Sequence, residues 1–486
     1  MNNLKQTTIN ALFWRGIEIY GQQGIHFVIQ IILARLLLPE QYGLIAMLAI
    51  FIALAHAFIN SGFAQALVQK KNITLTDESS VFYFNIIISI ITTSILWFIA
   101  PKIAAFYKQP LLTPLTRVLS LNLIIDALSQ IQKTILTRKI DFKSQLKVGV
   151  SASLLSGVFG IIMAYRGFGV WALVGQQVSR SLMQTTIFWL VSDWRPAFII
   201  SFNSLKGMFS FGSKLLFSGF LNTFFNNIYL VVIGRLFTPE ALGFYTRAKS
   251  IQQFPVSNLT TIISSVTFPV FARIQDQRNK VKIGAQQSLM ILIMIIAPCM
   301  LGLAIVARPL VSLVLTDKWL PCVPFIQLLC VVGIIWPLHV INLNVLMALG
   351  RSDLFFRLEV LKKILIVISI TITYRWGIHA MICGQVAVSI LSYYLNSYYS
   401  GKLIDYPIRE QIFNLAPYLA IAIVMAAGVY SIRWFQIAND VILLVTQILI
   451  GVVIYATLAW ILRMSAFTEI VNFSISKLPK PRKALA

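Results

Sequence analysis

The sequence has little charge for its length, and very little of that charge is acidic. Charged residues make up 12% of the 486 positions against 58% hydrophobic residues, and the formal net charge is +24. A soluble fold of this composition lacks enough polar surface to cover itself, so we expect lipid to be the solvent. The basic residues gather in short polar breaks between apolar runs, with no basic recognition helix and no aromatic RNA-binding signature, which argues against nucleic acid as a partner.

Cysteine and histidine are also scarce. The four cysteines form no Cys-x-x-Cys pair, and neither they nor the four histidines stand at metal-ligand spacing. Segment 207–214 reads GMFSFGSK, but its Lys does not directly follow a Gly as a Walker A loop requires. We therefore expect no metal, no cofactor and no ATP site.

The apolar runs are long enough to span a bilayer as helices. A cleavable signal peptide is not expected, because the first run already carries Arg15 and Glu18 and continues to about Leu38. The sequence predicts an all-α integral membrane protein with about 14 transmembrane helices. The predicted spans lie near 10–36, 42–68, 79–105, 113–137, 145–166, 169–192, 207–236, 242–271, 284–314, 322–349, 355–374, 377–400, 412–433 and 440–462.

The loops between these spans predict the orientation and restrict the function. With the N-terminus in the cytoplasm, about 24 Lys and Arg fall on the cytoplasmic side and about 10 on the outer side, as the positive-inside rule requires. Both termini are then cytoplasmic. Because the loops are short on both faces, they leave no room for an extramembrane catalytic domain, and we expect a protein that is not an enzyme.

An internal repeat divides the chain. Segment 35–43 reads RLLLPEQYG and segment 235–243 reads RLFTPEALG, at an offset of 200 residues. Six predicted spans separate equivalent points, so the halves should be parallel repeats enclosing a central cavity that opens to each side in turn. The predicted domains are a six-helix bundle at 1–197, a second at 198–408, and two additional helices with a basic cytoplasmic tail at 409–486, with 193–205 as the linker.

Polar residues recur at helical spacing inside several predicted spans. The first span carries a stripe from Arg15 to Gln30, and others follow in the fourth, sixth, seventh and eighth spans. Basic residues outnumber acidic ones there, so a shared cavity should attract an anion: Arg and Lys suit phosphate, and amide side chains suit sugar hydroxyls. The candidate substrate-binding residues are Arg15, Gln22, Lys133, Arg180, Lys214, Asn222, Arg247 and Lys249.

Two carboxylates in these spans, Glu18 and Asp126, are candidates for coupling transport to a proton or sodium gradient. The alternative is structural. Arg15 with Glu18 and Asp126 with Lys133 would then be internal ion pairs, while Arg180 and Lys214 extend to a membrane interface.

A family resemblance follows from particular segments. LARLLLPEQYGLIAM from Leu33, NSGFAQALVQKK from Asn60, LGFYTRAKSIQQFPVSNL from Leu242 and TFPVFARIQDQ from Thr267 resemble the polysaccharide-transporter branch of the MOP exporter superfamily, especially Wzx-type flippases of the colanic acid and lipopolysaccharide subgroup. The resemblance implies a V-shaped, MATE-like arrangement of two pseudo-symmetric six-helix bundles. It also implies export of undecaprenyl-diphosphate-linked oligosaccharide repeat units, for colanic acid, O-antigen or another exopolysaccharide, across the bacterial inner membrane, with a polysaccharide polymerase as a further partner.

Three other functions remain open at this point. A lipid II flippase of the same superfamily would also have a basic cavity, whereas a multidrug or cation antiporter should have more acidic than basic residues in its core. A membrane glycosyltransferase or polymerase, a different class, needs a catalytic carboxylate on a sizeable outer loop. The acidic residues Asp317 and Asp440 lie in outer loops that are short.

Overall fold

The computed structural model describes residues 2–59, 63–70, 72–435 and 439–469, and the side chains of these residues except 2–13, 15, 207–215, 217 and 218. Within these ranges every regular element is a helix, which confirms the predicted all-α class. The chain divides into two compact units, Met1–Thr246 and Arg247–Ala486. The division falls inside a helix, α9.

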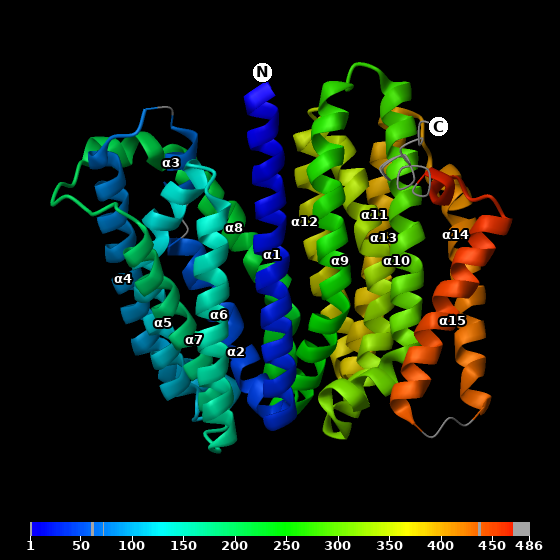
Figure 1. Ribbon diagram of the computed structural model, residues 1–486, viewed down its shortest axis with the longest axis horizontal. Coiled ribbons are helices and arrows are strands. Elements are labelled where there is room, and N and C mark those ends of the chain that lie inside the picture. Colours follow the sequence, from blue (N-terminus) through cyan, green and yellow to red (C-terminus); the bar gives the residue numbers. More distant parts are fainter. Residues whose placement is uncertain (1, 60–62, 71, 436–438, 470–486) are drawn as a thin grey trace, which may run out of the picture. The chain divides into compact units, whose positions relative to one another are not determined.

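Among its described residues, unit 1 has eight helices and the first turns of a ninth, coloured from blue to green in Figure 1. They are α1 (Asn2–Leu36), α2 (Pro39–Ile59), α3 (Phe63–Gln69), α4 (Leu75–Tyr107), α5 (Leu112–Arg138), α6 (Phe142–Tyr165), α7 (Val170–Val191), α8 (Phe202–Leu236) and the start of α9 (Pro239–Arg273).

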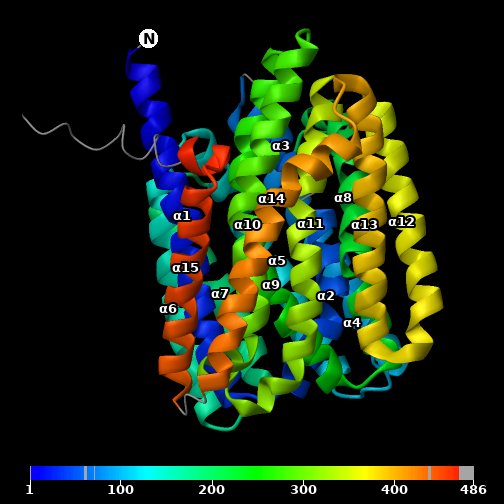
Figure 2. The ribbon, with the colours of Figure 1, turned by 90° about the vertical axis from the view of Figure 1, so that its right-hand side faces the viewer.

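The described part of unit 2 has the rest of α9 and six further long helices. Of these, α10, α11, α13 and α14 run side by side in Figure 2. They are α10 (Arg278–Leu315), α11 (Val323–Ala348), α12 (Ser352–Thr373), α13 (Gly377–Ile404), α14 (Ile408–Ser431) and α15 (Asp440–Ile461). Three short 3-10 segments join them: η1 (Asp317–Cys322), η2 (Tyr374–Trp376) and η3 (Ile432–Phe435).

Nine helical stretches among the described residues are long and apolar enough to cross a membrane. They are 39–69, 75–107, 112–138, 142–165, 239–273, 278–315, 317–348, 408–435 and 440–461. The other long helices, α1, α7, α8, α12 and α13, interrupt their apolar surface with polar and charged residues. The count of fourteen spans therefore stays a prediction.

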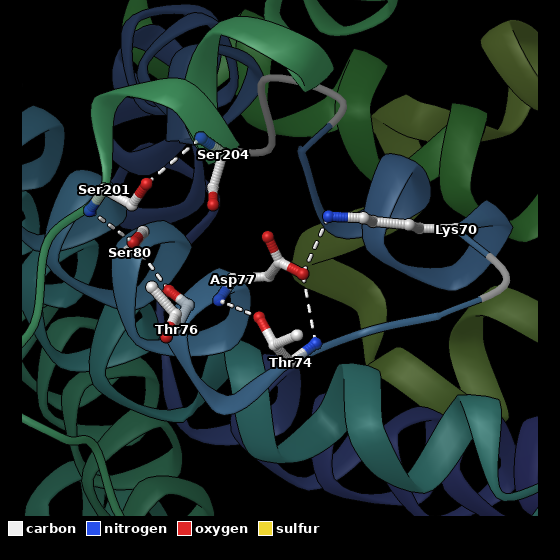
Figure 3. A network of polar contacts seen from close by, with 7 residues as sticks. All are labelled: Lys70, Thr74, Thr76, Asp77, Ser80, Ser201 and Ser204. Atoms are coloured by element: carbon white, nitrogen blue, oxygen red, sulfur yellow. Dashed lines mark hydrogen bonds and ion pairs between the residues drawn. The ribbon is translucent and has the colours of Figure 1, made fainter.

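The predicted linker is tied to the start of α4 by a polar network (Figure 3). Thr74 and Asp77 cap α4 reciprocally, and Lys70 Nζ lies 2.7 Å from Asp77 Oδ2. From the linker, the Ser201 backbone N–H donates to Ser80 Oγ at 2.8 Å. Because such caps satisfy the otherwise unpaired N–H groups at a helix end, the network fixes both where α4 begins and where α8 follows the linker.

The two copies of the sequence repeat adopt the same local structure. α1 ends at Leu36 and α8 at Leu236, and α2 and α9 then begin at Pro39 and Pro239. Proline suits the first position of a helix because its fixed φ is already helical and the N–H that it lacks would have had no partner there. The glutamate that follows each proline complements the positive end of the helix dipole.

The two copies also contact each other reciprocally, at the backbone. A Cβ atom on Gly43 of α2 would stand 1.7 Å from the carbonyl oxygen of Pro239, and one on Gly243 of α9 would stand 2.0 Å from that of Pro39. Both residues must therefore be glycine for the ends of α2 and α9 to approach this closely.

This contact predicts that Gly43→Ala and Gly243→Ala each destabilise the protein by about 1–3 kcal/mol or more, since overpacking against backbone cannot be relieved by a rotamer change. Thermal unfolding in detergent, followed by intrinsic fluorescence, measures the effect. The matched control is Gly302→Ala in α10, where nothing lies within 4 Å of the added Cβ. A Gly43→Ala protein as stable as the Gly302→Ala protein would contradict the contact.

Candidate functional site

Three helices of unit 1 bring together a group of charged side chains around Asp126. Asp126 on α5 lies 3.7 Å from His56 Nε2 of α2, measured from its Oδ2. Ser181 and Arg180 of α7 and Lys133 of α5 lie near enough to act on its carboxylate electrostatically. We call these five residues the Asp126 cluster.

The packing of unit 1 explains why these side chains meet. α5 packs against α2 and α7, so residues from three helices converge although they lie far apart in sequence. Thr185 of α7 reinforces the α5–α7 contact by donating to the Ile125 carbonyl oxygen at 2.9 Å. The side chains of His56 and Asp126 remain 33% and 36% exposed, so a ligand or a proton can reach them.

The cluster has a surplus of positive charge. Two permanent cations, Lys133 and Arg180, accompany one carboxylate, and protonation of His56 adds a third cation. Arg180 carries the planar fork that binds phosphate through two hydrogen bonds. The arrangement therefore suits an anionic group, and it also provides two adjacent groups that can exchange a proton.

Other predicted site residues lie elsewhere in unit 1. Glu18 of α1 is 6% exposed, Gln22 packs against Gly149 of α6, and Asn222 of α8 is exposed. Arg15 and Lys214 belong to α1 and α8, but their side chains lie outside the described residues.

Arg247 and Lys249 belong to the part of α9 in unit 2. The guanidinium of Arg247 lies 5.4 Å from the ring centre of Trp319, a fully buried side chain of η1. This cation–π contact joins α9 to η1, which gives Arg247 a structural role beside its proposed binding role.

A second polar group, in the core of unit 2, lies outside the sequence-based candidates. His339 of α11 is 3.2 Å from Ser389 Oγ and 3.3 Å from Asn396 Nδ2, both on α13. Gln411 of α14 donates to the Tyr406 carbonyl oxygen and is linked by hydrogen bonds to Asn342 of α11. These side chains are nearly fully buried and bond mainly to one another, so they join α11, α13 and α14.

A sequence signal existed for this network but not for His56. Ser389, Ser392, Asn396 and Ser400 follow one another at steps of three and four, as a polar stripe on α13 would. His56 stands alone in an apolar helix, and only the packing of α2 against α5 reveals its partner.

Comparison with known proteins identifies the family. Residues 32–324 match the family model described as "Polysaccharide biosynthesis protein". The chain belongs to this family. The membership that the segments from Leu33 onward predict is thereby confirmed.

Three curated relatives have names that refer to biosynthesis or transport. The chain is 31% identical to the teichuronic acid biosynthesis protein TuaB of Bacillus subtilis over 62% of its own length, and this match covers 63% of TuaB. It is 27% identical to the lipopolysaccharide biosynthesis protein WzxC of Escherichia coli, with 81% of each chain covered. The succinoglycan biosynthesis transport protein ExoT of Rhizobium meliloti is 24% identical, with 100% of this chain and 98% of ExoT covered.

Among solved structures, the fold resembles that of the lipid II flippase MurJ in an inward closed conformation. The TM-score is 0.74 at 15% identity, and the alignment covers 92% of this chain and 98% of MurJ. At this identity the likeness shows the fold alone, an all-helical fold like that of MurJ.

The geometry of the Asp126 cluster predicts energetic coupling between His56 and Asp126. In a double-mutant cycle of His56→Gln and Asp126→Asn, we expect a coupling energy of about 0.5 kcal/mol or more in the free energy of unfolding, because the two side chains are in direct contact. Pairing His56→Gln with Asp141→Ala, which removes the α6 N-cap instead, should give additive effects. Additivity in both cycles would show that the contact with Asp126 does not form.

Proposed function

We propose that the protein is an exporter that moves undecaprenyl-diphosphate-linked oligosaccharide repeat units from the inner to the outer leaflet of the bacterial inner membrane. The observation that carries this proposal is the match to the ExoT transport protein along the whole chain, together with membership of the polysaccharide biosynthesis family. The relatives named for lipopolysaccharide and teichuronic acid biosynthesis support the same proposal.

The Asp126 cluster supports an anionic, phosphate-bearing substrate. A polyprenyl diphosphate carries negative charge that cannot cross hydrocarbon unaided, and Lys133 and Arg180 lie on long helices where charge is costly unless it is used. We propose that these two cations contact the diphosphate, with Arg15, Gln22, Lys214, Asn222, Arg247 and Lys249 as further contributors.

We also propose that Asp126 couples export to an ion gradient. Its carboxylate is held among His56, Arg180 and Lys133, so a change in its protonation alters the charge that the anionic substrate meets. The orientation with both termini in the cytoplasm, the division into repeats at 1–197 and 198–408, and a polymerase partner belong to the same proposal.

The competing functions fit less well. The likeness to MurJ extends to the fold, while the curated relatives serve polysaccharide synthesis, so a lipid II substrate is the second candidate. A cation antiporter would need acidic surplus where the Asp126 cluster has basic surplus. A glycosyltransferase or polymerase needs a catalytic domain, and within the described ranges the connections between long helices are short. We therefore propose no catalytic activity.

The decisive test is leaflet transfer of a fluorescent undecaprenyl-diphosphate oligosaccharide in proteoliposomes. We expect the wild-type protein to transfer the lipid and the Arg180→Ala and Lys133→Ala variants to lose about tenfold or more of the rate, the loss expected when a charge-assisted phosphate contact is removed.

Arg166→Ala, at an exposed arginine in the connection after α6, is the matched control and should retain the wild-type rate. Arg15→Ala and Lys214→Ala extend the series to α1 and α8. Wild-type protein that transfers none of several sugar-bearing lipids would remove the exporter proposal. Full activity in Arg180→Ala and Lys133→Ala would keep the exporter proposal but contradict the proposed contact of these two residues with the diphosphate.

Imposed ion gradients test the coupling. We expect the transfer rate to depend on a proton gradient in the wild type and in Glu18→Gln, and to lose that dependence in Asp126→Asn, because Asp126 has an adjacent proton-exchanging partner in His56. A sodium gradient at constant pH separates the two ions. If the transfer rate of Asp126→Asn still depends on the proton gradient, Asp126 is not the coupling residue. If only Glu18→Gln loses this dependence, Glu18 of α1 is the coupling residue instead.

A further inference from the structure

A cavity of about 510 Å³ opens in unit 2 where the α14–α15 hairpin meets α10. The residues that line it come from four elements. They are Arg308, Pro309 and Ser312 of α10, Asp317 and Leu320 of η1, Arg433 of η3, and Asp440 and Leu443 of α15. We call it the Arg308 cavity. Its volume lies within the range of about 300–1,000 Å³ that is usual for small-ligand pockets.

The Arg308 cavity is lined by equal numbers of basic and acidic side chains. Two arginines, Arg308 and Arg433, face the same space as two aspartates, Asp317 and Asp440. Arg433 uses one N–H to donate to the Ile305 carbonyl oxygen at 2.9 Å, and Asp317 accepts from Ser312 Oγ at 2.6 Å. A guanidinium has five donors and a carboxylate about four acceptor positions, so all four groups keep hydrogen-bonding capacity for a ligand.

Neighbouring side chains place this cavity at the level of a membrane interface. Trp434 and Phe435, which directly follow Arg433, are each 79% exposed, and tryptophan is enriched where a bilayer meets water. The apolar lining residues Pro309, Leu320 and Leu443 accompany the charged ones. A ligand with a charged head and an apolar body fits this combination.

We propose that the Arg308 cavity binds the head of a zwitterionic phospholipid that carries a phosphate and a primary ammonium group. The arginines donate N–H bonds to the phosphate oxygens, and the aspartates accept N–H bonds from the ammonium. A diphosphate head, with more negative charge and no cation, would leave both aspartates facing like charge. By the predicted orientation the cavity lies on the outer side of the membrane.

Such a lipid has a structural consequence. Arg433 belongs to the turn of the α14–α15 hairpin, whereas Arg308 belongs to α10, so one phosphate between them joins the hairpin to the helix that it packs against. The Arg433 bond to the Ile305 carbonyl oxygen already makes one such link. The bound head adds a second, which depends on the composition of the surrounding membrane.

The test is lipid binding to the purified full-length protein, measured by native mass spectrometry with added lipids of identical acyl chains. We expect phosphatidylethanolamine to bind about tenfold more tightly than phosphatidylglycerol, which lacks the cation, and more tightly than phosphatidylcholine, whose ammonium has no N–H to donate.

Three variants locate the site. Arg308→Gln should weaken phosphatidylethanolamine binding about tenfold, and Asp440→Asn should abolish the preference over phosphatidylcholine. Arg375→Gln, an exposed arginine of η2 on the same predicted side of the membrane, should change nothing. Thermal unfolding without added lipid checks that each variant is folded.

Wild-type protein that binds phosphatidylglycerol as tightly as phosphatidylethanolamine would overturn the proposal, whatever the variants do. Unchanged binding in folded Arg308→Gln and Asp440→Asn proteins would overturn it too. Neither measurement involves transport, so the outcome is independent of the proposed function.

Discussion

Inside unit 1, the starts of α2 and α9 approach each other at the backbone, and this contact constrains both copies of the sequence repeat. Gly43 faces the Pro239 carbonyl oxygen and Gly243 faces that of Pro39, so the two halves of the contact are equivalent. Each glycine lies one turn after the proline that begins its helix. A helix start is therefore fixed both by its own chain, through proline and glutamate, and by the matching start of the other repeat.

The packing of α5 against α2 and α7 determines where charge collects in unit 1. A charged carboxylate without partners is costly in hydrocarbon, by about 2.5–3.5 kcal/mol on insertion scales. For Asp126, the neighbours His56, Ser181 and Arg180 offset this cost from two other helices. Removing one partner leaves the others uncompensated, so the cluster behaves as a unit rather than as separate side chains.

Much of this architecture follows from the sequence. What does not follow is which helices place their polar side chains in contact. Apolar run length predicted helices close to the observed α5 and α9 despite their internal charges, and the repeat predicted equivalent breaks at Leu36 and Leu236. Helical spacing likewise singled out Asp126, Lys133 and Arg180. It missed His56 because periodicity describes one helix at a time, whereas the contact with Asp126 forms between helices. The polar stripe of α13 signalled the His339 network, but not its partner on α11.

The Asp126 cluster and the Arg308 cavity differ in the one property that should determine their ligands. In the cluster, two permanent cations accompany one carboxylate, so a bound phosphate cancels a surplus; in the cavity, two arginines accompany two aspartates, so a phosphate must bring its own cation. Both sites attract phosphate through arginine, yet only the first tolerates a head that is purely anionic. Charge balance, more than the presence of arginine, therefore separates a site suited to cargo from one suited to a resident membrane lipid.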